Sequence, residues 1–221
     1  MFTNFYPRFE RKSVAPKIDW LLKIIAPVIT LSLLLYCCFT EALVMTSMSI
    51  KTATFATDRS TLFEIINDAY KVEIGDSGVA FKSMPRMVSI DRITESDFCD
   101  QKGVLKMCTS DESQGTAGEV MGCIFYEIKE DSVYFGPFAV SPQHAGKGIG
   151  KTLLRAVIDI GKKHELQWCE LYCVNHRSDL INIYSKWGFE VFGDNVPYPV
   201  PDRLTRPSHF VRMRKLLTDP L

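Results

Sequence analysis

VYFGPFAVSPQHAGKGIGKT, at residues 133–152, is the stretch that decides the fold. Its first half is a run of β-branched and aromatic residues, which is typical of a strand, and the run ends at Ser141-Pro142. Three glycines then alternate at positions 146, 148 and 150, and apolar residues at helical spacing follow over 153–160. The stretch therefore predicts a strand, a glycine-rich turn and a helix in direct succession.

A turn of this kind favours a phosphate ligand. The first N–H groups of a helix have no partner within the helix and carry the positive end of its dipole, so they can hold an anion. Glycines let the backbone approach the ligand and form a concave nest of N–H donors. A glycine-rich turn can also serve tight packing only, so the turn alone leaves both interpretations open.

Three phosphate-binding patterns compete for this turn. The pattern G-x-x-x-x-G-K-[ST] is met in its second half by residues 150–152, but its first glycine falls on Ala145. The dinucleotide pattern G-x-G-x-x-G lacks its third glycine here. The third pattern, [Gln/Arg]-x-x-Gly-x-[Gly/Ala] at a strand-to-helix turn, is met in full by Gln143, Gly146 and Gly148.

The third pattern resembles the acetyl-CoA site of the GCN5-related N-acetyltransferases (GNAT). In that family a strand and then a helix ending in Tyr-x-x-x-Gly-Phe follow the turn, and Tyr184, Gly188 and Phe189 match this ending after a strand-like run at 168–175. Residues 175–180 also resemble a branch of the family with Arg-x-[Glu/Asp]-Leu before the tyrosine, and residues 66–71 are similar to its first helix. The resemblance covers about residues 48–217.

The resemblance implies an α/β (α+β) fold of the acyl-CoA N-acyltransferase type, with a mixed, largely antiparallel, splayed sheet flanked by helices. It implies acetyl-CoA as co-substrate, with the pantetheine arm along the strand at Phe138, Ala139 and Val140. Pro137 cannot join a strand ladder, so it marks a bulge or an edge where the sheet opens. Asn175 is expected to bond to the cofactor arm. The residues expected to surround the pyrophosphate are Gln143, His144, Ala145, Gly146, Lys147, Gly148, Ile149, Gly150 and Lys151.

Tyr184 is the expected general acid, which protonates the departing thiolate, because a phenol with a pKa near ~10 is close to a thiol in acidity. The alternative interpretation is a half-buried amphipathic aromatic. The residues do not identify the base. Glu119, Glu127 and Glu170 all lie on predicted strands, and each is as readily explained as a solvated strand residue. Arg177 stands where asparagine is usual in the family, which leaves the cofactor contact at that point open.

The order of predicted elements fits this fold class. Strands are expected at 49–56, 104–109, 119–129 and 132–140, and a final hairpin at 189–196 and 209–216 around the loop 197–208. Helices are expected at 60–72, capped by Asp58, at 95–102 and at 146–164, with an irregular substrate-side loop at 73–86.

The amino-acid composition limits which binding partners are expected. The 221 residues suit one domain plus an extension, and 26 basic residues balance 26 acidic ones, so nucleic acid is not an expected partner. Seven cysteines at irregular spacing fit no metal pattern, and no metal is expected. The oligomeric state stays open.

The first 47 residues are predicted to be an extension, separate from an N-acetyltransferase domain at 48–221. Residues 24–40 contain no charged side chain, and the apolar stretch at about 20–44 is just long enough to span a membrane. If retained, it predicts a single-pass membrane protein with a cytoplasmic N-terminus, since basic residues precede it. A cleaved signal peptide, or a start at Met45 or Met48 that leaves a cytoplasmic enzyme, are the alternatives.

Two functions from different classes remain after this reading. The first is an N-acetyltransferase that moves an acetyl group from acetyl-CoA to a primary amine of a small molecule or peptide. The second is a non-catalytic acyl-CoA-binding module anchored to a membrane. A nucleotide-triphosphate enzyme that uses residues 150–152 is a third and weaker alternative, because the first glycine of its pattern is missing.

Overall fold

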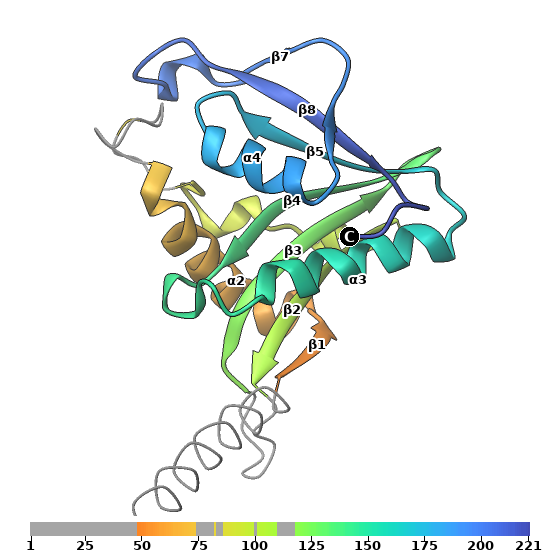
Figure 1. Cartoon of the computed structure of the whole chain (residues 1–221). Coiled ribbons are helices and arrows are strands. Elements are labelled where there is room, and N and C mark those ends of the chain that lie inside the picture. Colours follow the sequence, from red (N-terminus) through yellow and green to blue (C-terminus); the bar gives the residue numbers. More distant parts are fainter. Residues whose placement is uncertain (1–47, 74–81, 83–85, 100, 110–117) are drawn as a thin grey trace, which may run out of the picture. The chain divides into compact units, whose positions relative to one another are not determined.

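A mixed sheet with helices on both faces forms the part of the chain that the computed structural model describes, which is residues 48–221 without 74–81, 83–85, 100 and 110–117 (Figure 1). The strand order is β1-β2-β3-β4-β5-β8-β6, and β7 also pairs with β8. The strands are β1 (Met48–Thr52), β2 (Lys102–Thr109), β3 (Val120–Ile128), β4 (Ser132–Val140), β5 (Trp168–Val174), β6 (Glu190–Val191), β7 (Val196–Pro197) and β8 (His209–Leu216).

All neighbouring strands are antiparallel except β4 and β5, which are parallel. The β4–β5 register covers only Ser132–Tyr134 of β4, and the rest of β4 pairs with β3 alone. Gly136 and Pro137 form a bulge, because the β3–β4 register steps from Phe138 to Phe135 while β3 advances by only two residues. The sheet therefore splays between β4 and β5, which confirms the predicted fold class.

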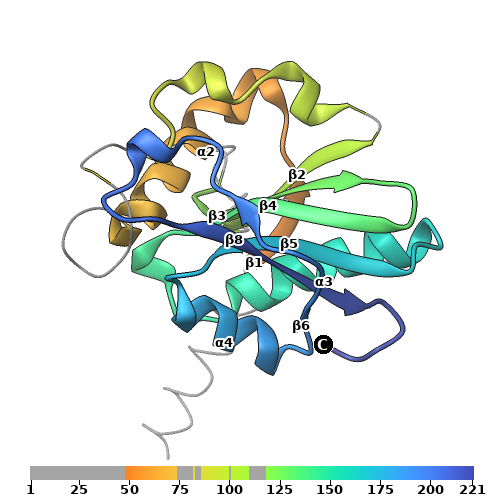
Figure 2. The ribbon, with the colours of Figure 1, turned by 90° about the horizontal axis from the view of Figure 1, so that it is seen from above.

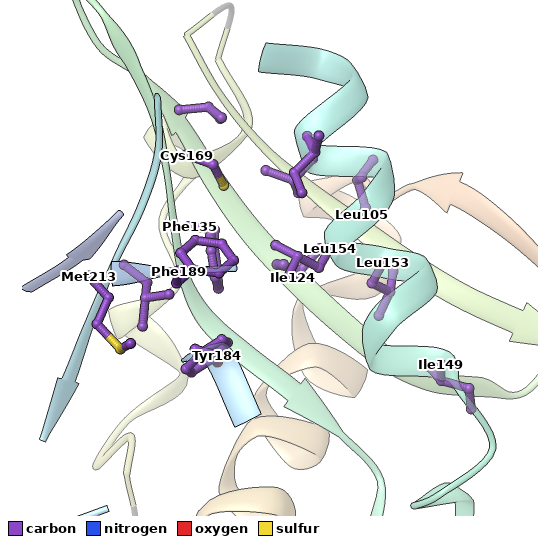
Figure 3. Packing of buried hydrophobic residues seen from close by; sticks show 14 of the residues in the cluster. Leu105, Ile124, Phe135, Ile149, Leu153, Leu154, Cys169, Tyr184, Phe189 and Met213 are labelled. Atoms are coloured by element: carbon purple, nitrogen blue, oxygen red, sulfur yellow. The ribbon is translucent and has the colours of Figure 1, made fainter. Parts of the chain in front are cut away.

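Three α-helices cover the sheet: α2 (Phe55–Ala69), α3 (Ile149–Lys163) and α4 (Ser178–Lys186). Figure 2 shows α2 on one face and α3 with α4 on the other. In α3 the buried side chains recur at helical spacing, and Leu153 and Leu154 point toward Leu105 and Ile124 of the sheet (Figure 3). Full burial of each such leucine stabilises the fold by about 1.5–3 kcal/mol.

The start of α2 differs from the prediction. The helix begins at Phe55, inside the stretch predicted as a strand, and Thr54 is its N-cap. Asp58, predicted as the cap, lies in the first turn, where its carboxylate accepts the Thr54 N–H at 2.8 Å and pairs with Lys106 of β2. This buried ion pair is a tertiary contact between elements far apart in sequence, and local residue preferences do not reveal it.

Two further predicted elements are shorter than expected. The helix predicted at 95–102 is a 3-10 turn over Glu95–Phe98. The predicted strand at 189–196 is divided into the two-residue strands β6 and β7, each of which pairs with β8. Gly193 separates them with a φ of 62°, a left-handed conformation that breaks an extended run.

Within the described residues, no helix is long and apolar enough to cross a membrane. The predicted membrane-spanning stretch at about 20–44 lies outside these residues, as does most of the predicted loop at 73–86. The division of the chain at residue 47 therefore stays a prediction.

Candidate functional site

The glycine-rich turn joins β4 to α3. After the 3-10 turn Pro142–His144, Gly146 and Gly148 both adopt a φ of 79°, and Gly148 is the N-cap of α3. A Cβ added at either glycine would meet no atom within 4 Å. These glycines are therefore required by the backbone conformation and not by close packing, which favours the ligand-binding interpretation of the turn over the packing one.

The backbone amides of the turn are available to a ligand. The first backbone hydrogen bond of α3 runs from the Thr152 N–H to the Gly148 carbonyl at 3.0 Å. Among the residues that the structure describes, no backbone hydrogen bond uses the N–H groups of residues 146–151. A run of free amides at the positive end of a fifteen-residue helix is a strong anion-binding arrangement.

A cavity of about 710 Å³ opens onto these amides. Its walls come from the turn, the end of β4, the end of α2 and the start of α4, so it lies where β4 has separated from β5. The predicted site residues in its lining are Phe138, Ala139, Val140, His144, Ala145, Gly146, Gly148, Ile149, Gly150, Lys151 and Tyr184.

Three predicted cofactor residues lie outside this lining. Gln143 and Lys147 are exposed on the turn. The Asn175 side-chain oxygen accepts the N–H of His209 at 3.2 Å, and the Asn175 N–H donates to the His209 carbonyl at 3.0 Å. Asn175 therefore ties the end of β5 to the start of β8 in this structure, and its bond to the cofactor arm stays a prediction.

Tyr184 projects from α4 into a group of aromatic rings at the cavity wall. Its ring centroid lies 5.8 Å from those of Trp187 and Phe189 and 6.0 Å from that of Phe135. Figure 3 shows Tyr184 near Phe135 and Phe189. Burial raises the pKa of the Tyr184 phenol well above its usual value, and the nearby Tyr70 and Cys173 raise it further. The phenol is therefore held in its protonated form at neutral pH, which is the form that a general acid requires.

Tyr70, at the end of α2, is a lining residue that the sequence reading did not include. Burial raises the pKa of its phenol, while a hydrogen bond from the backbone N–H of Phe138 lowers it. The Tyr70 oxygen thus lies beside the Phe138 amide, on the strand along which the pantetheine arm is expected. No motif contains Tyr70, and only its place on the helix at 66–71 pointed toward the site.

Arg177 is a second lining residue that had no assigned role. Its Nη1 lies 2.7 Å from a carboxylate oxygen of Glu73, and both side chains are almost fully buried, at 12% and 7% exposure. Its other nitrogens make a bidentate pair with Asp179 at 2.8 and 2.9 Å. Burial raises the pKa of Glu73, and Arg177 opposes that rise. The pair fixes the start of α4 against the end of α2, so it sets the width of the cavity.

The remaining lining residues come from the end of α2 and from α4 with its C-cap, and they were also missed: Ala69, Leu180, Ile183, Lys186 and Trp187. The three glutamates considered as bases do not line the cavity. Glu119 lies 3.1 Å from His144 on the outside of the turn, and Glu127 lies 3.5 Å from Lys102. In the described part of the chain, no group of three or more histidine, cysteine or acidic side chains is arranged to hold a metal ion.

Comparison with known proteins agrees with this geometry. Residues 84–189 match the model of the acetyltransferase (GNAT) family. The ribosomal-protein-S18-alanine N-acetyltransferase from Escherichia coli superposes with a TM-score of 0.58 at 16% identity, over 79% of this chain and 96% of that one. The spermidine/spermine N-acetyltransferase SpeG from Vibrio cholerae gives 0.55 at 16% identity, over 78% and 94%.

A GCN5-related N-acetyltransferase from Kribbella flavida gives a TM-score of 0.56 at 15% identity, over 80% of this chain and 99% of that one. A search of the curated proteins finds no match. The splayed sheet, the turn and the family model together define an acyltransferase of the acyl-CoA N-acyltransferase fold. The chain belongs to the GNAT superfamily, whose co-substrate is acetyl-CoA.

Proposed function

We propose that the chain is an acetyl-CoA-dependent N-acetyltransferase that acetylates a primary amine of a small molecule or peptide. The observation that carries the proposal is that one cavity is lined both by Tyr184, whose phenol is protonated, and by residues of the turn whose amides are free, namely Gly146 and residues 148–151. An anion site and a proton donor are the two groups that acetyl transfer from coenzyme A requires from the protein.

The residues of this cavity fit the co-substrate along its length. The turn at 146–151 suits the pyrophosphate, because its amides are unbonded and Lys151 adds positive charge nearby. The end of β4 suits the pantetheine arm, because residues beyond Tyr134 have no β5 partner and can offer backbone groups to a ligand. The Phe138 N–H, which donates to the Tyr70 oxygen here, would exchange that acceptor for the thioester carbonyl, whose oxygen gains negative charge as the amine attacks.

Acetyl-CoA supplies an activated acetyl thioester. The chain's own part is to hold both reactants in contact and to manage two protons. Tyr184 donates its phenolic proton to the departing thiolate, and the same burial that raises the phenol pKa also favours a neutral thiol over a thiolate. The incoming amine must lose a proton, and we assign no residue to that step.

The test is release of free thiol by the full chain with acetyl-CoA across a panel of primary amines. We expect turnover with at least one amine class, and we expect Tyr184→Phe to abolish it while calorimetry shows unchanged acetyl-CoA affinity. Binding of acetyl-CoA without thiol release from any amine would instead support a non-catalytic acyl-CoA-binding module. Competition of ATP against coenzyme A would support the nucleotide-triphosphate alternative.

Attachment to a membrane through residues 20–44 is a separate prediction. It is tested on the native protein by N-terminal sequencing, which shows whether the segment is retained, and by alkaline carbonate extraction of membranes. Recovery of a native chain that begins at Met45 or Met48 would end the membrane prediction and leave the proposed activity unaffected.

A further inference from the structure

Arg86 packs against Tyr70, a residue of the cavity lining, but is not itself part of that lining. Its guanidinium carbon is 5.3 Å from the ring centroid of Tyr70, which lines the cavity. Its Nη1 lies 3.4 Å from the hydroxyl oxygen of Tyr198, in the segment after β7. Arg86 therefore joins the end of α2 to a segment that is 112 positions later in the sequence.

The backbone around Arg86 is held in place on both sides. The side-chain amide of Asn67 in α2 accepts the N–H of Met87 at 2.8 Å and donates to the Met87 carbonyl at 3.2 Å. On the other side, the Lys82 N–H donates to the Arg203 carbonyl at 3.0 Å, and the Lys82 ammonium donates to the Asp202 carbonyl at 2.8 Å. The backbone of Met87, which follows Arg86, is thus fixed to α2.

Among the residues that the structure describes, no acidic side chain pairs with the charge of Arg86. Glu73 acts on it from further away, but its carboxylate is already bonded to Arg177 at 2.7 Å. A half-buried guanidinium has five N–H donors, and a long contact to a neutral hydroxyl leaves most of that capacity for a ligand.

A row of aromatic rings leads to the Tyr198 hydroxyl that Arg86 contacts. Tyr134 and Tyr172 pack with ring centroids 5.3 Å apart, Tyr172 stacks on Phe210 at 6.1 Å, and Phe210 packs on Tyr198 at 5.1 Å. This row runs from β4 across β5 and β8 to the hydroxyl that Arg86 contacts. An apolar ligand body with a single negative group suits such a surface, because a planar guanidinium binds a carboxylate through two parallel hydrogen bonds.

We propose that Arg86 binds a carboxylate of the acceptor, so that the substrates are amino carboxylates, meaning amino acids or short peptides with the carboxylate a few atoms from the amine. This inference rests on the proposed N-acetyltransferase function. Because Tyr70 both lines the cavity and packs against Arg86, we expect a compact acceptor to place its amine in the cavity and its carboxylate past the Tyr70 ring. A monoanion is favoured over a phosphate, because the negative charge of Glu73 already acts on Arg86.

The test compares matched acceptor pairs on the full chain. Each of the amino acids is paired with the amine left by removing its carboxyl group, for example leucine with isoamylamine and phenylalanine with phenethylamine. We expect the wild type to prefer the carboxylates. Arg86→Gln should raise KM for the carboxylates by about 10- to 100-fold and change KM for the matched amines by less than about threefold. Arg155→Gln, at an exposed site on α3, is the charge-matched control and should change neither.

Binding of the acetylated products tests the inference without requiring catalytic turnover. N-Acetylleucine should bind the wild type more tightly by calorimetry than N-isoamylacetamide does, and Arg86→Gln should remove this difference. If no thiol is released from acetyl-CoA with any amine, the proposed function fails. The comparison of N-acetylleucine with N-isoamylacetamide still tests the role of Arg86 in that case. If Arg86→Gln does not fold, Arg86→Lys and Tyr198→Phe are measured instead, and both should weaken carboxylate binding. Equal binding of the two products, or a preference for 2-aminoethyl phosphate over all amino carboxylates, overturns the inference.

Discussion

Replacing Gly148 by alanine separates the two properties of the turn, its conformation and its ligand. Gly148 has a φ of 79° and a ψ of −2°, and a Cβ there would meet no atom within 4 Å. The substitution therefore introduces no clash, and its effect on stability is limited to the left-handed backbone, which costs a residue with a Cβ about 1–2 kcal/mol. For a chain of this size that corresponds to a decrease in Tm of about 2–8 °C.

The effect on the ligand is expected to be larger. The added methyl group would point into the open space beside the free amides of residues 146–151, where the pyrophosphate is proposed to bind. Loss of one hydrogen bond to a charged group is worth about 1.5–3 kcal/mol, so acetyl-CoA affinity should fall by about 10- to 100-fold. Isothermal titration calorimetry on the folded variant measures this directly.

Gly193→Ala is the matched control. Gly193 has a φ of 62°, so it carries the same kind of backbone strain, but it lies between β6 and β7 and outside the cavity lining. Its Cβ would lie 3.1 Å from the end of the Arg212 side chain, which can shift. We expect both variants to lose similar stability and only Gly148→Ala to lose affinity. A folded Gly148→Ala chain that binds acetyl-CoA as tightly as the wild type would refute the proposed site.

Four other predictions follow from the structure. Tyr184→Phe should lower kcat by about 10²- to 10⁴-fold in the thiol-release assay, and a decrease in affinity without a decrease in kcat would contradict the assigned role. Because the Tyr184 pKa is raised, the phenol loses its proton only as pH rises above about 10. We therefore expect kcat not to fall between roughly pH 7 and 9.5. A fall in this range that is absent from Tyr184→Phe would contradict the role of Tyr184 as the acid. Gly188→Ala should lower the free energy of unfolding, measured in urea, by about 2–5 kcal/mol. Gly188 has a φ of 86°, and the new Cβ would lie 2.6 Å from Nζ of the buried Lys215. A loss under about 1 kcal/mol would show that Lys215 moves freely. Arg177→Met should cost about 3–5 kcal/mol because it leaves the buried Glu73 carboxylate uncompensated, and the double variant with Glu73→Leu should recover part of that loss if the pair is responsible.

The parts of the fold that the sequence predicted well are those determined by local pattern. The strand at 132–140 matches β4 in full, because β-branched and aromatic residues dominate the run on both sides of Gly136-Pro137. The helix after the turn was also predicted within a few residues, since its apolar spacing is regular and glycines mark its start. The splay beyond Tyr134 was indicated by Pro137, which cannot donate to a ladder, and the register shift at this point agrees.

The parts that the sequence did not predict depend on contacts between distant residues. Arg177 and Glu73 are 104 positions apart, and neither is part of a motif that names the other. Asp58 reads as a helix cap because aspartate is common there, whereas its partner Lys106 lies 48 positions later. Tyr70 reads as one member of an apolar helix face, and only the fold brings its hydroxyl to the Phe138 amide. In each case the sequence shows which chemical groups are present, but not which of them lie close together in the fold.

The cavity and the charged residues around it have a common structural origin. A parallel neighbour would normally occupy the outer edge of β4 along its whole length, but here β5 pairs with it only as far as Tyr134. The space left by β5 needs walls, and α4 and the end of α2 provide them, fixed to each other by Glu73 and Arg177. Because these walls carry buried ions, a ligand between them meets fixed charges and not water, and electrostatic recognition is stronger in such surroundings. The second arginine, Arg86, lies against the same wall at Tyr70 and has no acidic partner among the described residues, so we expect the acceptor to supply the negative charge.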